Sequence, residues 1–251
     1  YLEDGGEMFN KIEFNIAAYI HIIGRPASGT DQRGEEFDAD EEAVLPADHA
    51  AAGFYIPNPH NALVGNAASG GWAGFAFPVF DTCLKLSAHL TVIPKNQPML
   101  KFEGNSAHSA GNYWGDAGCT YQGGRLWDPN GDGKLRYSNG RYSQPTRKND
   151  AKQSGWVGTE WTLWHQATNY RAWLCQKGFS SWGERVDMTA FECHDCALSA
   201  VLFGESSIQN ALITGWSANY PYDMTDDNDV VRAGFGFYDT GVKTMLVNVT
   251  F

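Results

Sequence analysis

Hydrophobic positions along the chain fall in short runs that alternate with polar residues, and few stretches have the periodicity of an amphipathic helix. The segments 186–195 (VDMTAFECHD) and 242–251 (VKTMLVNVTF) are two such runs, both rich in residues that favour strands. Asn and Gly separate runs of this kind, which is typical of tight turns between short strands. The pattern therefore predicts an all-β fold.

One part of this pattern repeats within the chain. Residues 10–18 (NKIEFNIAA) and 61–69 (NALVGNAAS) share a nine-residue pattern. It consists of Asn, any residue, Ile or Leu, any two residues, a second Asn, any residue, Ala and a small residue. A looser copy at 210–218 (NALITGWSA) has Gly215 in place of the second Asn. The corresponding asparagines are Asn10 and Asn15 in the first copy and Asn61 and Asn66 in the second.

This repeat predicts a solenoid of stacked β-rungs, in which inward side chains form ladders and Asn bonds along the turns. An ordinary β-sandwich in which the Asn pairs coincide by chance is the alternative. The stretch 60–78 (HNALVGNAASGGWAGFAFP) would then be one rung. Its Gly and Ala residues would allow tight corners and close stacking, and Trp72, Phe75 and Phe77 would fill the interior.

Several further segments resemble, in the same order, the β-helix region of fibrocystin-like proteins and of the related cell-migration-inducing hyaluronidases. They are YLEDGGEMFNKIEFNIAA, HNALVGNAASGGWAGFAF, GKLRYSNGR, WLCQKGFSSWGERVDMTAFECHDC, FGESSIQNALITGWSAN and GFGFYDTGVKTMLVNVTF. The likeness is nearer to fibrocystin-like proteins of algae and other protists than to the vertebrate enzymes.

The resemblance implies a right-handed parallel β-helix, a pectin-lyase-like solenoid with long inserted loops. We expect residues 1–251 to form a single β-helix domain within a longer chain, in a large extracellular or cell-surface glycoprotein. Some members of the family depolymerise hyaluronan, and for many others the role is structural. Fold alone does not decide between these functions.

Charge and composition indicate which kinds of partner the protein is not expected to bind. The net charge of −11 argues against binding to nucleic acid or to an anionic membrane surface. No apolar run approaches the roughly 20 residues that a membrane span needs. The five cysteines are an odd number, so one of them is free or pairs outside this chain.

The weak candidates for catalysis are Asp4, Glu7 and His21. Paired carboxylates can act as general acid and base on a glycosidic bond. The alternative is that Asp4 lies in a turn and that the acids bond to backbone or water. These residues decide between a polysaccharide-depolymerising glycosidase, acting on a hyaluronan-like substrate, and a non-catalytic module.

Aromatic residues are abundant, and the candidates for stacking on sugar rings are Trp114, Trp127 and Trp161. Most of the Trp side chains are expected to be structural. For the non-catalytic module the expected partners are other domains of the same long chain, a glycan, or further copies in a filament.

Two short motifs suggest ligands or modification. Asp128, Asn130 and Asp132 alternate as at the start of a calcium loop, although a turn rich in Asx residues explains them equally well. Asn248 begins the sequon Asn-Val-Thr, a glycosylation site if the protein is secreted. No other cofactor is expected.

The CHDC motif at 193–196 contains two cysteines close in sequence. A structural zinc site needs four ligands, and no second CxxC exists in the chain. If the segment is extended, the two thiols face opposite sides and lie too far apart to bond. One of them is then expected to be a buried rung residue.

Overall fold

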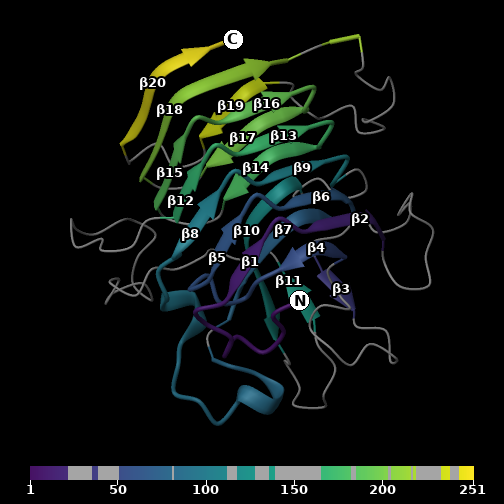
Figure 1. Cartoon of the computed structure of the whole chain (residues 1–251), viewed down its shortest axis with the longest axis vertical. Helices are drawn as coiled ribbons and strands as arrows, with labels where there is room; N and C mark the ends of the chain where they lie inside the picture. Colours follow the sequence, from purple (N-terminus) through teal and green to yellow (C-terminus); the bar gives the residue numbers. More distant parts are fainter. Residues whose placement is uncertain are drawn as a thin grey trace.

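The computed structural model describes residues 1–21, 36–38, 51–80, 82–111, 118–127, 136–138, 165–181, 185–202, 205–215, 217–218, 233–237 and 243–251. Within these ranges the chain winds into a parallel β-helix, each rung of which runs through three faces (Figure 1). Each strand pairs in parallel with the equivalent strand of the next rung. The predicted β-helix is therefore confirmed.

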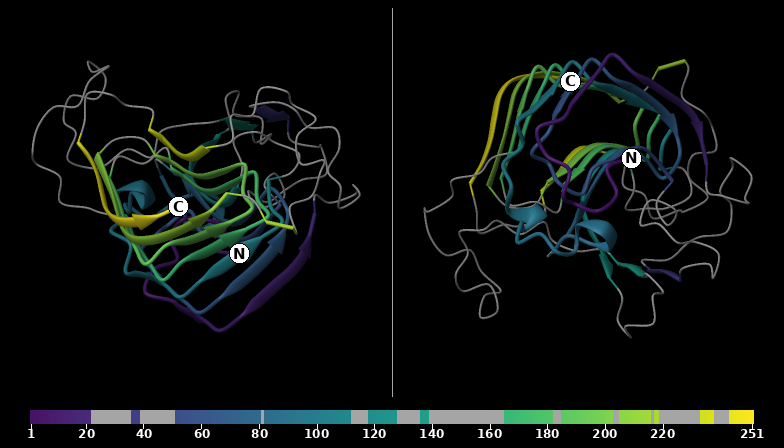
Figure 2. Two further views of the ribbon diagram at one scale, coloured as in Figure 1. Left: turned by 90° about the horizontal axis from the view of Figure 1, so that it is seen from above. Right: turned by 60° about the horizontal axis from the view of Figure 1, so that its bottom comes forward.

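The first two faces are continuous with each other. Face 1 consists of β1 (Lys11–Glu13), β5 (Ala62–Val64), β8 (Lys101–Glu103), β12 (His165–Thr168), β15 (Arg185–Thr189) and the first parts of β18 (Glu205–Thr214) and β20 (Thr244–Thr250). Face 2 consists of β2 (Ile16–Ile20), β6 (Ala67–Gly70), β9 (Ser106–His108), β13 (Arg171–Trp173), β16 (Glu192–His194) and the ends of β18 and β20. Figure 2 shows them as one curved wall.

Face 3 forms the opposite, inner wall in the same views (Figure 2). It consists of β4 (Ala52–Tyr55), β7 (Ala73–Val79), β10 (Gly118–Trp127), β14 (Lys177–Ser181), β17 (Leu198–Leu202) and β19 (Ala233–Phe237). At the end of β10, two short antiparallel strands extend the sheet: β11 (Arg136–Ser138) and β3 (Glu36–Asp38). Two 3₁₀ turns, η2 (Lys85–Ser87) and η3 (Pro94–Asn96), lie between face 3 of one rung and face 1 of the next.

The corner between faces 1 and 2 is built in the same way in every described rung. One residue there has a left-handed backbone, with φ between 51° and 65°. This conformation bends the chain from face 1 into face 2 and is costly for most residues other than Gly and Asn. The column consists of Phe14, Gly65, Gly104, Asn169, Ala190, Asn210 and Asn248.

The position of Asn210 corrects one detail of the sequence repeat. The looser copy at 210–218 aligns Asn210 with Asn61, whereas the structure places it in the corner column, equivalent to Gly65. The β-rung itself is present, but its register differs from the one expected.

An asparagine ladder runs through the first rungs directly after this corner, as the repeat predicted. Asn66 Oδ1 accepts hydrogen bonds from the backbone and side-chain amides of Asn15, both at 3.1 Å. Asn66 donates in turn to Asn105 Oδ1, at 2.9 and 3.1 Å. The Nδ2 groups of Asn66 and Asn105 also bond to the carbonyl oxygens of Ile12 and Leu63. The ladder thereby satisfies buried backbone groups at successive corners.

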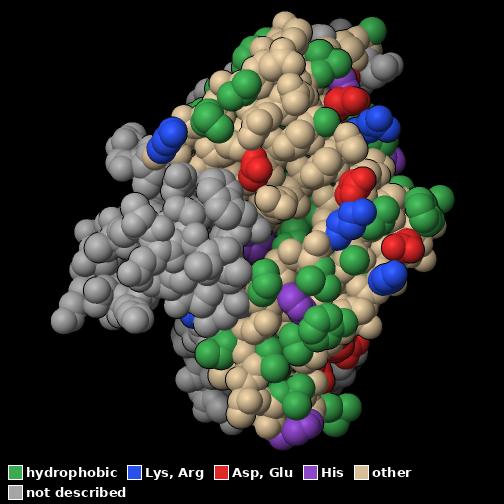
Figure 3. Space-filling view, turned by 60° about the vertical axis from the view of Figure 1, so that its left-hand side comes forward, with side chains coloured by type: hydrophobic (Ala, Val, Ile, Leu, Met, Phe, Trp, Pro, Cys, Tyr) green, Lys and Arg blue, Asp and Glu red, His purple; other side chains and the backbone are tan. Residues whose placement is uncertain are grey.

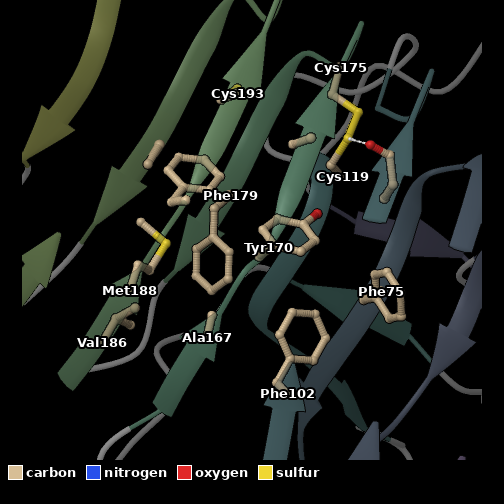
Figure 4. Close-up of a cluster of buried hydrophobic side chains, with 14 of the residues drawn as sticks. Phe75, Phe102, Cys119, Ala167, Tyr170, Cys175, Phe179, Val186, Met188 and Cys193 are labelled. Carbon is tan, nitrogen blue, oxygen red and sulfur yellow. Dashed lines mark hydrogen bonds between the residues drawn. A yellow bond between two sulfur atoms is a disulfide. The ribbon is translucent and has the colours of Figure 1, made fainter. Parts of the chain in front are cut away.

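Beyond Asn105 the same column becomes aromatic. Tyr170 occupies the next rung and Phe191 the one after, with their rings parallel and their centroids 6.0 Å apart. Tyr170 also packs against Phe102 and Phe179 in the interior (Figure 4). The ladder thus changes from hydrogen bonding to ring stacking without changing its place in the fold.

Small residues fill the space where faces 2 and 3 approach each other. A Cβ on Gly74 would lie 2.6 Å from the Cβ of Ala107. A Cβ on Gly178 would lie 2.6 Å from the Sγ of Cys193. The rings of Phe75 and Phe77 are fully buried beside this narrow region. The Gly- and Ala-rich stretch therefore has the structure expected of it: close stacking next to a ring-filled interior.

Candidate recognition surface

Asp4 and Glu7, two of the candidate catalytic residues, lie before β1 and bond to backbone. Glu7 Oε1 accepts hydrogen bonds from the backbone amides of Glu3 and Asp4, at 3.2 and 3.3 Å. Asp4 Oδ2 accepts one from the backbone amide of Ser87, at 3.3 Å. These contacts stabilise the turn that leads into the first rung, which is the structural alternative considered for the two acids.

His21, the third candidate, follows β2 at the corner between faces 2 and 3. Its ring makes an edge contact with Tyr19, with centroids 5.5 Å apart. Asp4 lies instead beside the loop at 84–87, where its carbonyl accepts from Leu84. The structure thus brings Asp4 and Glu7 together and places His21 at a different corner of the rung.

Most of the other candidates lie outside the described residues. These are Trp114, Trp161, Asp128, Asn130 and Asp132. Trp127 ends β10, and its side chain is also outside the described part.

Asn248 is described and exposed. It lies in β20 at the left-handed corner, and its Nδ2 donates to Asn210 Oδ1 at 2.8 Å.

Face 2 carries a group of polar and aromatic side chains on its outer side. Alanine or cysteine points inward at the centre of β9, β13 and β16, so the residues on either side of it project outward. Parallel register stacks them in two columns. One column contains His108, Trp173 and His194, and the other contains Ser106, Arg171 and Glu192. We call these six residues the face 2 rib.

Ring stacking and ion pairing order the rib. The rings of His108 and Trp173 are stacked, with centroids 4.7 Å apart and an interplanar angle of 16°. Arg171 Nε lies 3.3 Å from Glu192 Oε2, and His194 Nε2 lies 3.9 Å from the same oxygen. Partial burial lowers the pKa of His108, which favours its neutral form. Two pairs of side chains thus join adjacent rungs: His108 with Trp173, and Arg171 with Glu192.

The rib therefore presents ring edges, a guanidinium group and a carboxylate along the helix axis. Neighbouring members of each column are separated by the spacing of parallel strands, about 4.8 Å. His108 covers one face of Trp173, and the register places His194 on the other side. A ligand would therefore meet edges and hydrogen-bonding groups rather than an open ring face.

The sequence contains a signal for this rib that the Asn repeat does not reveal. The segments NSAH (105–108), YRAW (170–173) and FECH (191–194) share a buried corner residue, a polar residue, a small residue and a ring. The period-two alternation places the second and fourth positions outside. Only the comparison of these four-residue windows would have found it.

On the side of the molecule that includes face 1, charged groups of both signs are mixed. Figure 3 shows acidic and basic side chains alternating along the right-hand margin of this side, and hydrophobic side chains gathered lower down. An ion pair of face 1 joins Lys101 Nζ to Glu103 Oε2 at 2.8 Å. Within the described ranges no cluster of His, Cys, Asp and Glu could hold a metal ion. Among the same residues no helix is long and apolar enough to cross a membrane.

Comparison with known proteins supports the architecture. Residues 1–114 match the family model described as CEMIP beta-helix. Over all 251 residues the chain is 42% and 41% identical to two G8 domain-containing proteins of Dictyostelium discoideum, covering 17% and 22% of their lengths. It is 40% identical to communication mutant protein F of the same organism, covering 22% of it. The chain thus spans about a fifth of the curated relatives that it matches.

Proposed function

Residues 1–114 match the CEMIP beta-helix family, and the whole chain is similar to part of G8 domain-containing proteins; from this premise we propose that it is a non-catalytic extracellular module. In this proposal it belongs to a large cell-surface or filament-forming glycoprotein and recognises carbohydrate through the face 2 rib. The rib is the observation that carries the proposal.

The geometry of the rib suits an extended, hydroxyl-rich polymer. Arg171 and Glu192 offer donors and acceptors on a frame of paired strands, and the rings of His108 and Trp173 stack on each other beside them. The backbone of this surface is already ordered, so binding costs no backbone entropy there. Each rung adds one side chain to each column of the rib along the helix axis, so a chain of sugars could contact several side chains in turn.

The non-catalytic role is supported by the two acids before the first rung. The carboxylates of Asp4 and Glu7 accept from backbone amides and so stabilise a turn. A general acid and base must instead face the substrate across an open site. His21 lies at another corner of the rung and does not complete such a site with them.

An extracellular setting is supported by sulfur chemistry and by exposure. Cys119 and Cys175 form a disulfide, a bond that persists mainly in oxidising compartments. The sequon residue Asn248 is exposed at a corner, so the side chain that a glycan would join is accessible.

Assembly with further β-structure is supported by the two ends of the helix. Phe9, Phe14 and Ile16 are 71%, 77% and 81% exposed on the first rung. Met245 and Leu246 are 39% and 44% exposed on β20. Unpaired strand edges with apolar side chains favour the addition of another strand. In our proposal, other domains of the same long chain cover these ends.

The test incubates the full-length protein with hyaluronan and a panel of other polysaccharides. Binding is measured, and the products are sized by gel filtration. We expect binding without shortening, and at least a tenfold weaker affinity in the double variant Arg171→Ala, Trp173→Ala. The matched control is Lys101→Ala, Glu103→Ala, which removes the exposed face 1 ion pair and should leave binding unchanged.

Shortened polysaccharide would overturn the non-catalytic role and favour the glycosidase alternative. Failure to bind any member of the panel, or equal loss in both double variants, would overturn recognition by face 2.

A further inference from the structure

Cys193 and Cys196 lie on either side of a corner and not on one extended segment. Asp195 between them has a left-handed backbone, with φ of 54°, and turns the chain from face 2 towards face 3. Both cysteines therefore belong to the buried core, with exposures of 0% and 6%. The expectation of thiols on opposite sides held for an extended segment, whereas here a corner separates the two cysteines.

In the structure Cys193 and Cys196 are both free, buried thiols, and the side chain of Cys196 is near enough to Cys193 to raise the pKa of its thiol. Cys196 Sγ also lies 3.6 Å from the carbonyl oxygen of His194, a weak interaction for a thiol. The pair thus sits in a buried region in which each sulfur is the other's near neighbour.

A disulfide already exists one rung away. The register that pairs Trp173 with His194 places Cys196 directly over Cys175, which is bonded to Cys119. Figure 4 shows Cys193 and this disulfide at the same end of the interior cluster. Oxidising conditions that form one bond would act on the neighbouring thiols during the same folding step.

We propose that Cys193 and Cys196 form a second disulfide, which closes the corner between faces 2 and 3 in the fifth rung. Both S–H bonds break, one S–S bond forms, and two electrons and two protons pass to an oxidant. A small-molecule disulfide such as oxidised glutathione accepts them and becomes two thiols. The proposal does not depend on carbohydrate recognition.

The surroundings indicate a structural bond rather than a catalytic redox centre. Reactive CxxC pairs have an exposed, low-pKa thiolate, often at a helix N-terminus. Here burial raises the pKa of Cys193 well above its usual value, and the neighbouring Cys196 raises it further. The thiolate is thus scarce in the folded state, so oxidation occurs while the rung closes and the bond is afterwards shielded.

This pairing accounts for the odd number of cysteines. Two disulfides use four of the five, and Cys83 remains as a buried thiol. Burial raises the pKa of Cys83, and the nearby carboxylates of Glu7 and Asp4 raise it further. Cys83 is therefore expected to stay reduced and slow to react.

The test maps thiols in the full-length protein, purified without reductant, denatured in N-ethylmaleimide and cut with trypsin. Cys193 and Cys196 share the tryptic segment 186–232, while Cys119 and Cys175 fall in 102–125 and 172–177. We expect segment 186–232 to be unlabelled, two hydrogen atoms lighter than its sequence, and labelled twice only after reduction. Linked segments 102–125 and 172–177 are the internal control for preserved disulfides.

Two labels on segment 186–232 without reduction would overturn the proposal, as would its linkage to segment 172–177. The variant Cys196→Ser provides a second readout in the same mapping. If the disulfide exists, the number of labels on segment 186–232 rises from none in the wild type to one in the variant, on Cys193. If both thiols are free, the number falls from two to one.

Discussion

Asn66 donates both its backbone and its side-chain amide to a single oxygen, Oδ1 of Asn105 on the next rung. Its own Oδ1 receives the same pair of bonds from Asn15. Each asparagine therefore fixes the register of two rungs at once. The strands on either side are short and have few backbone hydrogen bonds to fix their register, so the corner asparagines fix it instead.

The first prediction concerns Asn66→Ala. Asn66 is 1% exposed, and its loss would leave Asn105 Oδ1 and the carbonyl of Ile12 without their side-chain donor. We expect the free energy of unfolding to fall by about 3 kcal/mol, measured by urea denaturation. Asn15→Ala is the control, because Asn15 is exposed. Equal losses in the two variants would contradict the role of burial in the ladder.

The second prediction concerns Gly178→Ala. The added Cβ would meet Ser199 O at 2.5 Å and Cys193 Sγ at 2.6 Å, so the backbone would have to move. We expect a loss of about 2 kcal/mol, seen as a lower denaturation midpoint. Gly215→Ala is the matched control, since no atom lies within 4 Å of its Cβ position. An unchanged midpoint for Gly178→Ala would mean that faces 2 and 3 pack less closely than described.

The third prediction concerns pH. Burial lowers the pKa of His165 to about 4, while in the unfolded chain it is near 6.5. Between these values the unfolded state binds a proton that the folded state does not, so stability falls as pH decreases through this window. The loss approaches about 3 kcal/mol at pH 4. The free energy of unfolding of the wild type and of His165→Gln is measured at about pH 4 and pH 6.5. If both proteins lose the same stability between these values, His165 is not the cause of the pH dependence.

The fourth prediction concerns the Cys119–Cys175 bond, which joins residues 56 apart in the sequence. Replacing both cysteines with Ser removes a constraint on the unfolded chain and should cost about 4 kcal/mol. Thermal and urea unfolding without reductant provide the measurement. Cys83→Ser is the control and should change stability much less, because Cys83 forms no disulfide.

The fifth prediction follows from the proposed extracellular setting: Asn248 carries an N-linked glycan. Its side chain is exposed, and a glycan on Nδ2 would replace one hydrogen and leave the other to bond to Asn210 Oδ1. Enzymatic deglycosylation should convert Asn248 to Asp, which mass spectrometry of the tryptic peptide detects. An unmodified Asn248 in protein from its natural source would contradict the prediction.

The sequence predicted the first rungs well because their corners use a distinctive side chain. Asn10 and Asn61, like Asn15 and Asn66, are separated by 51 residues, and the strands pair at the same offset, Lys11 with Ala62. The dipeptide Gly104-Asn105 repeats Gly65-Asn66 and marks the third rung.

Later rungs were harder to align because the corner column changes chemistry. Tyr170, Phe191 and Ala211 replace asparagine there, so a search for Asn pairs finds the wrong register at Asn210. The face 2 rib was missed for a related reason. Its members alternate with buried residues within single short strands, and only their stacking across rungs makes them a surface.

The corner between faces 1 and 2 separates the parts of this chain that can vary in length from those that cannot. A residue added at Gly104, for example, would turn the next strand over and exchange its buried and outward side chains. A segment added between β2 and β4, or where face 3 passes into the next rung between β7 and β8, would leave the stacking intact, because long connections already lie there. Those two junctions are therefore where a reporter domain, an epitope or a new binding loop can be inserted without redesigning the frame.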